Sequence, residues 1–289
     1  GLGLQSLVVH PNLTPDDRLV RFQVSMLVSR IEDRFGNSLT YNYGSGQLQS
    51  ITASDGRQVS VSYVAGTDRI SALSVTPASG PARTWSYQYN TDARPLLTGV
   101  VLPDGTAWSY NLAGLRSGLV IDEGSGDCDN LGAVSSNVLS GSIVHPSGLT
   151  GTFQIQPMVH GRSYVPRQCV MPSTGSLSSY AYNPRTYAAF SITRKTFSGA
   201  GLSLPQAWVY SYSPANASWS QDCAGGCAST VWTDVVDPLG QAVRSTFSNR
   251  FDETEGQLQR TDYYSGAVGS SLLRSEANLY AASTTGAWP

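Results

Sequence analysis

The stretch that decides the fold is Ile51-Thr52-Ala53-Ser54-Asp55-Gly56-Arg57-Gln58-Val59-Ser60-Val61-Ser62-Tyr63. A β-branched residue stands five positions before its glycine, and large apolar residues stand five and seven positions after it. Two side chains that are two positions apart share a face in a strand, because side chains alternate along a strand with a period of two. An Asp-Gly pair suits a tight turn that needs positive φ. The stretch therefore predicts a strand, a turn and a second strand.

The same template occurs seven times, and its closest copies are 20 to 27 residues apart. Its glycines are Gly36, Gly56, Gly80, Gly105, Gly148, Gly175 and Gly240. The large side chains that follow them include Tyr43, Tyr63, Tyr87, Tyr110 and Tyr182. A repeat of this length is typical of stacked units, since one hairpin alone cannot bury its apolar side. The sequence predicts an all-β protein of repeated antiparallel hairpins that form a curved, spiralling sheet.

The period also predicts how the chain is organised. We expect one continuous β-repeat domain over residues 1–289, with the clearest repeats at 30–112, 141–190 and 235–264. Irregular insertions are expected at 113–140 and 191–234, where the period is interrupted. A short helix is expected over residues 268–282.

A family resemblance supports the repeat. The segment Tyr41-Asn42-Tyr43-Gly44-Ser45-Gly46-Gln47-Leu48-Gln49-Ser50-Ile51 resembles the YD repeat of the bacterial RHS proteins. The resemblance is clearest over about residues 30–112 and returns near 235–264, but the usual Asp after Tyr is here Gly44, Val64 or Asn90. It implies a spiralling antiparallel sheet that forms part of a hollow shell. The chain starts at Gly1 inside what looks like continuing sequence, so we expect a fragment of a longer bacterial protein.

Composition limits the partners. Only 13% of the 289 residues are charged and the net charge is −2, so nothing favours binding to nucleic acid or to an anionic membrane. No apolar run is long enough to span a bilayer. Lys195 is the only lysine, which suggests a GC-rich bacterial genome. We expect a bacterial protein that is secreted or displayed on the cell surface.

The four cysteines are Cys128, Cys169, Cys223 and Cys227. The glycines between Cys223 and Cys227 allow the close approach that a disulfide requires, which leaves Cys128 to pair with Cys169. Four reduced thiols are the alternative. A zinc site is disfavoured, because the three histidines lack the spacing of a zinc finger.

Catalytic signals are weak. The chain has no nucleophile elbow, phosphate loop or His-Glu-x-x-His motif, so we expect no catalytic residue, cofactor or metal. Three alternatives stay open: a Ser–His site at His145 or His160, calcium in the acidic loop 122–129, and cleavage chemistry at Asp237-Pro238, where we expect a turn. The cleavage alternative follows from the RHS resemblance, because Asp237-Pro238-Leu239-Gly240 resembles the Asp-Pro-x-Gly of the RHS core, where that family can cleave itself after its shell; a neighbouring second copy is absent here.

The aromatic residues offer a better functional surface. Trp219 and Trp232 lie outside the template and are candidates for binding, whereas the template rings are expected to pack a sheet face. The first functional hypothesis is a non-catalytic segment of an RHS/YD-repeat shell, which encloses or presents another segment such as a toxin. Its partner would be the remainder of its own long chain or that toxin. The alternative is an adhesion module that binds a glycan or a surface receptor, and an enzyme ranks third.

Overall fold

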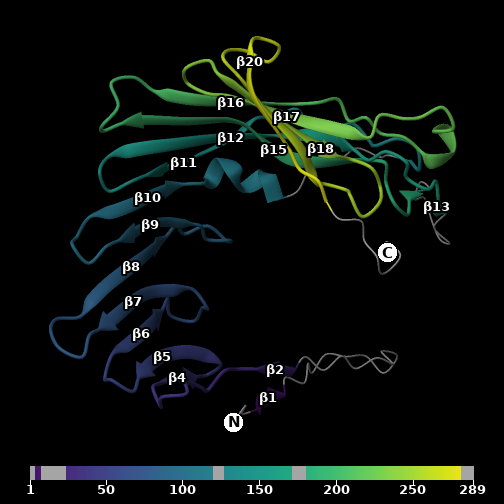
Figure 1. The fold of residues 1–289 in the computed structure, drawn as a ribbon. Helices are drawn as coiled ribbons and strands as arrows, with labels where there is room; N and C mark the ends of the chain where they lie inside the picture. The colour runs from purple at the N-terminus through teal and green to yellow at the C-terminus, as the bar shows by residue number, and fades with distance from the viewer. Residues whose placement is uncertain (1–3, 8–23, 120–126, 171–179, 281–289) are drawn as a thin grey trace. The chain divides into compact units, whose positions relative to one another are not determined.

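The computed structural model describes residues 4–7, 24–119, 127–170 and 180–280 (Figure 1). Within these residues the chain is all-β, with strands β1 to β20 and two short 3₁₀ helices. Sixteen strands, β3 to β12 and β15 to β20, form one antiparallel sheet in which β3 and β20 are the end strands, so the sheet is not closed into a barrel. The prediction of an all-β protein built from repeated antiparallel hairpins is confirmed.

Contacts group the chain into two compact units, residues 1–108 and 109–289, where the sequence led us to expect one domain. In the first unit, β1 (Leu4–Leu7) pairs with β2 (Val24–Met26) outside the main sheet. The ladder of this unit contains β3 (Arg30–Glu32), β4 (Ser38–Gly44), β5 (Gln47–Ala53), β6 (Gln58–Tyr63), β7 (Ile70–Thr76), β8 (Arg83–Tyr89) and β9 (Leu97–Val101). The boundary between the units lies within β10 (Ala107–Asn111).

The template glycines occupy the turns that the sequence predicts. Six have positive φ: Gly36 (85°), Gly56 (89°), Gly80 (102°), Gly105 (83°), Gly148 (87°) and Gly240 (82°). Gly175 lies outside the described residues. In the Gly105 turn the glycine N–H donates to the carbonyl of Leu102 at 2.9 Å, which closes the turn. In the copies at Gly36, Gly56, Gly80 and Gly148, the β-branched residue five positions earlier and the apolar residues five and seven positions later lie on paired strands.

We expect Gly105→Ala to lower the free energy of unfolding by about 1–2 kcal/mol, the usual cost of a left-handed backbone for an L-residue. Steric clash cannot contribute, because no atom lies within 4 Å of the position that a Cβ would occupy. Gly225→Ala is the matched control, since Gly225 is equally open but its φ is not positive. Urea unfolding of both variants measures the difference. Equal effects of the two substitutions would contradict the turn-strain explanation.

The sheet of the first unit has one apolar face and one hydroxyl-rich face. Register places two apolar rows on one face: Tyr41, Ile51, Val59 and Val75 across β4 to β7, and Val61, Leu73 and Trp85 across β6 to β8. The opposite face carries a row of Asn42, Ser50, Ser60, Ser74 and Thr84. Because side chains alternate along each strand, the template builds both rows at once.

Tyrosines near the ends of three strands bind the main chain of the segment before them. Their hydroxyls donate to carbonyl oxygens, from Tyr43 to Val28 (3.0 Å), from Tyr63 to Leu48 (2.9 Å) and from Tyr89 to Ile70 (2.9 Å). Each of the three faces a β-bulge in the following strand. In β8 this position is held by Tyr89 and not by Tyr87, which instead lies opposite Val100.

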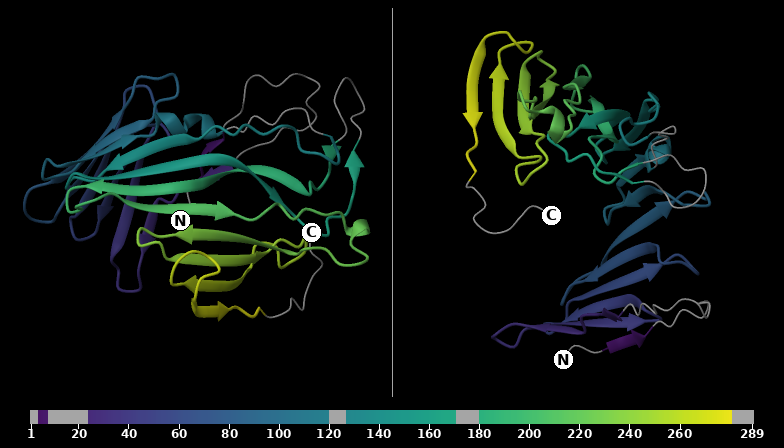
Figure 2. Two further views of the ribbon diagram at one scale, coloured as in Figure 1. Left: turned by 90° about the horizontal axis from the view of Figure 1, so that it is seen from above. Right: turned by 90° about the vertical axis from the view of Figure 1, so that its right-hand side faces the viewer.

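In the second unit, η1 (Ala113–Leu119) precedes β11 (Leu139–Val144). The main sheet continues with β12 (Leu149–Gly161), β15 (Thr186–Gly199), β16 (Gln206–Tyr212), β17 (Thr230–Val236), β18 (Ala242–Ser248), β19 (Leu258–Tyr264) and β20 (Leu272–Ala277). The long strands β12 and β15, teal and green in Figure 2, pair over their whole length. Strand β16 pairs only with Arg194–Phe197 of β15, so the first half of β15 extends past it.

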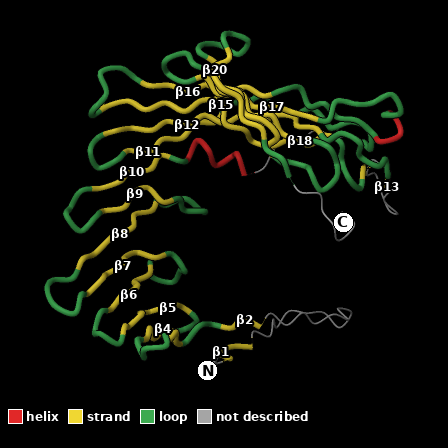
Figure 3. The backbone as a smooth tube through the Cα atoms, viewed as in Figure 1, coloured by secondary structure: helices red, strands yellow, loops and turns green. Residues whose placement is uncertain are grey.

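The helix η1, red beside β10 and β11 in Figure 3, covers part of the sheet. A Cβ added to Gly118 would lie 3.2–3.7 Å from Ile155, Leu139 and Phe190, which shows how closely the helix packs on β11, β12 and β15. This contact gives the second unit a covered apolar region. Neither 3₁₀ helix in the described residues is long and apolar enough to cross a membrane.

Three expectations from the sequence are wrong. Residues 191–234 are not an irregular insertion, because they contain all of β16 and most of β15 and β17. The repeat expected around Val170 is instead a separate hairpin in which β13 (Cys169–Val170) pairs with β14 (Tyr180–Ala181), and Tyr182 is 69% exposed. Residues 272–277 form β20 and not a helix. In each case pairing with a neighbouring strand, which local periodicity does not encode, decided the outcome.

Candidate functional site

A pocket of about 220 Å³ lies at one end of the sheet in the second unit. It forms where β16 stops pairing with β15 and the chain after Tyr212 turns towards β17. Its wall comes from the ends of five strands and two loops: His160, Gly161, Tyr187, Tyr212, Ser213, Pro214, Ala215, Val231, Trp232, Thr233, Phe247, Ser248, Asn249, Glu255 and Gly256. Antiparallel pairing brings these ends together, because each contributing strand starts or finishes at the same edge.

His160 lies at the centre of the aromatic part of the wall. Its ring centroid is 5.7 Å from that of Tyr187 and 5.9 Å from that of Tyr212, and the second contact is edge-to-face. Its Nε2 forms a hydrogen bond of 2.8 Å with Ser191 Oγ. Partial burial lowers the pKa of His160, because burial disfavours the charged imidazolium.

The Ser191–His160 pair does not form an accessible nucleophile. Ser191 is only 9% exposed and does not line the pocket. Glu255 lines the pocket with His160, but its carboxylate accepts a hydrogen bond of 2.5 Å from Arg162 Nε. A nucleophilic serine must reach its substrate and be activated by its base. The arrangement therefore offers no support for the Ser–His alternative at His160.

One wall of the pocket is a strained loop held by side-chain hydrogen bonds to the main chain. Asn216 has a φ of +50°, and its Nδ2 donates to Thr230 O at 2.8 Å. Its carbonyl accepts from Nδ2 of the buried Asn249 at 3.1 Å. A Cβ on Gly161 would lie 2.0 Å from Ala215 O, so only glycine allows this loop to pack on β12. Strained backbone that its surroundings hold in place is common at ligand sites.

The two tryptophans that the sequence singles out for binding lie in different surroundings. Trp232 lines the pocket, but alternation places its ring on the opposite side of β17 from Val231 and Thr233. The Arg244 guanidinium lies 4.0 Å from the centre of that ring, and Arg244 also forms two hydrogen bonds of 2.7 Å with Asp234. One face of the Trp232 ring is therefore occupied by the protein itself.

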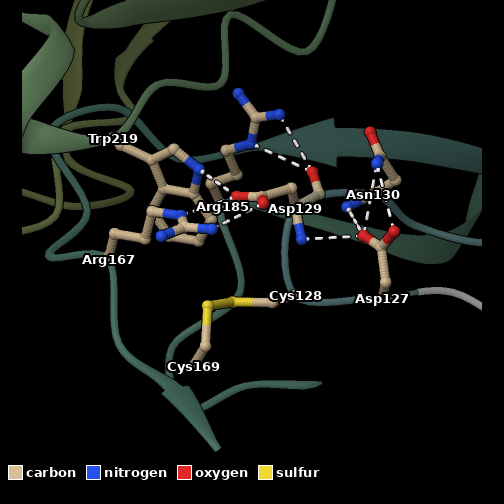
Figure 4. The surroundings of a disulfide bond; sticks show 8 residues. All are labelled: Asp127, Cys128, Asp129, Asn130, Arg167, Cys169, Arg185 and Trp219. Atoms are coloured by element: carbon tan, nitrogen blue, oxygen red, sulfur yellow. Dashed lines mark hydrogen bonds and ion pairs between the residues drawn. A yellow bond between two sulfur atoms is a disulfide. The ribbon is translucent and has the colours of Figure 1, made fainter. Parts of the chain in front are cut away.

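Trp219 is 3% exposed and belongs to a structural cluster (Figure 4). Its Nε1 donates to Asp129 Oδ1 at 3.0 Å, and the Arg185 guanidinium lies 5.3 Å from the ring centre. Arg167 donates to both oxygens of Asp129, at 2.8 and 2.7 Å. Hydrogen bonds from Arg167 lower the pKa of Asp129 to about 2. The buried Trp219 ring offers little surface to a ligand from solution, so its contacts indicate a structural role.

The predicted disulfide pairing is confirmed. Cys128 bonds to Cys169 and Cys223 bonds to Cys227, and no cysteine is free. The first bond fixes the loop that carries Asp129 beside β13, and the second closes the loop after Trp219. Two disulfides in one chain are typical of proteins that leave the reducing cytosol.

The remaining candidates lie apart from the pocket. His145 Nδ1 forms a hydrogen bond of 2.8 Å with Ser147 Oγ inside the Gly148 turn. Asp237 Oδ1 accepts from the N–H groups of Leu239 and Gln241, as expected for a turn. Residues 122–126 of the acidic loop lie outside the described residues. In the described part of the chain, no group of three or more His, Cys, Asp or Glu side chains could hold a metal.

The lowered pKa of His160 predicts a direction of pH dependence. Below about pH 6.5 the unfolded state takes up a proton that the folded state resists. The free energy of unfolding should therefore fall as the pH drops from about 7 through the lowered pKa. Urea unfolding at several pH values measures this dependence. The free energy of unfolding should change less steeply with pH in His160→Asn than in the unaltered protein. His145→Asn, outside the pocket, is the control, and an unchanged slope in His160→Asn would rule out this residue as the cause.

Comparison with protein-family models and with curated proteins finds no match to this chain. The RHS resemblance of residues 30–112 therefore stays a hypothesis, and the function is argued from the sheet and the pocket.

Proposed function

We propose that this chain is a non-catalytic segment of an RHS/YD-repeat shell, which encloses or presents another protein segment such as a toxin. The observation that carries the proposal is the apolar face of the first unit. Substantial contacts between elements in its described part run only between neighbouring strands, so none of the described elements of this unit forms a second layer on that face. A shallow hollow of about 260 Å³ opens on it beside Leu39, Ile51, Val59 and Val75. An apolar face of this kind favours a protein partner.

In this proposal the protein is displayed on the bacterial cell surface or secreted into the medium. The two disulfides support an oxidising compartment. The enclosed partner would be the remainder of a longer chain or a toxin. The shell would act through its backbone ladders and its apolar rows, and no residue would carry out catalysis.

Side-chain footprinting tests the proposal. Hydroxyl-radical labelling of Tyr41 and Trp85 should be several-fold lower in the complete protein that the gene encodes than in the 289-residue chain. Phe35, which is 74% exposed in a turn, is the control and should label equally in both. Equal labelling of Tyr41 and Trp85 in the two proteins would refute enclosure at this face.

Binding to a glycan or surface receptor is the second candidate function, and the pocket of the second unit is the observation that favours it. Tyr187 is 37% exposed at its edge, and His160, Tyr212 and Phe247 contribute further rings. Aromatic rings in a concave site are typical of ligand pockets. The hydrogen bonds among the residues that line this pocket bear on which class of ligand the pocket can bind.

A further inference from the structure

We propose that the pocket, together with the adjoining edge of β15, holds an extended peptide that inserts one uncharged aromatic side chain. The inference rests on the proposed function, since this peptide would belong to the segment that the shell encloses or presents. It adds a specific anchoring site in the second unit, distinct from the apolar face of the first.

The size of the pocket suits a single ring. Its volume of about 220 Å³ is below the roughly 300–1,000 Å³ of pockets for drug-sized ligands. Tyr187, Tyr212, Phe247 and His160 line it. Aromatic pairs gain energy from edge-to-face or offset contacts beyond the burial of apolar area. A phenyl or phenol group would make such contacts here.

The polar groups of the wall disfavour a sugar. Ser213 Oγ donates to Pro214 O at 3.0 Å, Ser248 Oγ bonds to Thr254 Oγ1 at 2.8 Å, and the Tyr212 hydroxyl donates to Ile192 O at 2.8 Å. Nδ2 of Asn249 already donates to Asn216 O. A sugar brings several hydroxyls that lose their hydrogen bonds to water, and each would need a new partner. Most of the available partners are already engaged within the protein.

Charge disfavours an ionised side chain as well. Arg162 and Glu255 form an ion pair at 2.5 Å beside the pocket, with the Arg162 guanidinium 5.1 Å from the Tyr187 ring centre. The two charges neutralise each other, so neither sign is favoured inside. Burial of a charge without a partner costs several kcal/mol. The geometry therefore selects a neutral group.

The edge of β15 supplies the second observation. Residues 186–191 pair with β12 on one side, but among the described residues no strand pairs with them on the β16 side. Tyr187 belongs both to this edge and to the pocket wall. Unpaired strand edges bind extended peptides through main-chain hydrogen bonds, and neighbouring pockets give specificity for side chains. An edge beside a ring-lined pocket matches this mode of recognition.

The test uses ¹⁵N–¹H NMR of the folded 289-residue chain with the neutral probe acetyl-Thr-Val-Phe-Val-Thr-amide. We expect shifts of the amide signals of residues 187–191 and of the pocket loops. The same peptide with Ser in place of Phe should bind about tenfold more weakly. Tyr187→Ala should also weaken binding about tenfold, whereas Tyr182→Ala, which truncates a more exposed tyrosine outside the pocket, should leave it unchanged.

If Tyr187→Ala does not fold, Thr233→Phe is the second variant. The larger side chain on β17 would fill the pocket, so this variant should not bind the peptide. Shifts with methyl α-glucopyranoside but not with the peptide would overturn the proposal in favour of a glycan site. No binding of the peptide at up to about 5 mM would overturn it outright. Either failure leaves the footprinting of Tyr41 and Trp85 unaffected, so failure of this site and failure of the shell can be told apart.

Discussion

Replacement of Trp219 by alanine is expected to lower the free energy of unfolding of the second unit by about 3–5 kcal/mol, the usual cost of deleting a buried tryptophan. The ring is 3% exposed, and the main chain around it joins separate segments. Val165 forms an isolated bridge with Trp219 and donates its N–H to Ser218 O at 3.1 Å. Loss of the ring would leave a cavity beneath Arg185 and remove one hydrogen-bond donor from Asp129.

Trp219→Phe is the matched variant, because it keeps an aromatic ring of smaller volume and loses the Nε1 hydrogen bond to Asp129. We expect it to cost about 1–2 kcal/mol. Urea unfolding followed by circular dichroism measures both variants. A cost below about 1 kcal/mol for Trp219→Ala would contradict a structural role, since deleting a buried tryptophan side chain normally costs more. The residue would then have to be reconsidered as a binding residue.

Removal of the Cys128–Cys169 disulfide is expected to cost about 4 kcal/mol, and removal of Cys223–Cys227 about 2 kcal/mol, from the loop entropy that each bond withdraws from the unfolded chain. The two bonds differ in sequence separation, 41 residues against 4, and a longer closed loop restricts the unfolded chain more. Cys128 also lies next to Asp129, so its bond holds the Arg167 and Trp219 contacts together (Figure 4).

The double variants Cys128→Ser/Cys169→Ser and Cys223→Ser/Cys227→Ser make the comparison, and each serves as the control for the other. In urea unfolding, the loss of free energy of unfolding should be larger for Cys128→Ser/Cys169→Ser than for Cys223→Ser/Cys227→Ser. An equal or larger loss from the short loop would show that local contacts around Cys223, which is 8% exposed, outweigh loop entropy. Reduction of the unaltered protein with dithiothreitol breaks both bonds, so it should lower the free energy of unfolding by more than either double variant does.

Several features could be predicted from the sequence because they are local. The turn at Gly56 depends on a few consecutive residues, of which the glycine must adopt positive φ. The alternation of Val59, Val61 and Tyr63 lies within the single strand β6. The pairing of Cys223 with Cys227 follows from a separation of four residues, and Cys128 with Cys169 follows by elimination. These features depend on the chemistry of neighbouring residues, so periodicity and spacing reveal them.

The pocket could not be predicted in the same way. His160 could be noted only as a rare histidine, Tyr187 followed no template, and Gly161 carried no signal of its role. They meet because β15 is longer than β16, and the mismatch leaves an edge that the loop after Tyr212 partly encloses. Trp219 likewise looked free in the sequence and is buried by Asp129, 90 residues away.

The sequence by itself determined the strand–turn–strand unit, the all-β class and the Cys223–Cys227 pair, because alternation, turn chemistry and short cysteine spacing act over a few residues. The Cys128–Cys169 pair follows only by elimination. Only the tertiary structure decided which strands extend past their neighbours, which tryptophan is buried, and where the ring-lined pocket opens. Those outcomes depend on strand register and on contacts between residues far apart in the chain. The energies of such contacts cannot be inferred from a local sequence pattern.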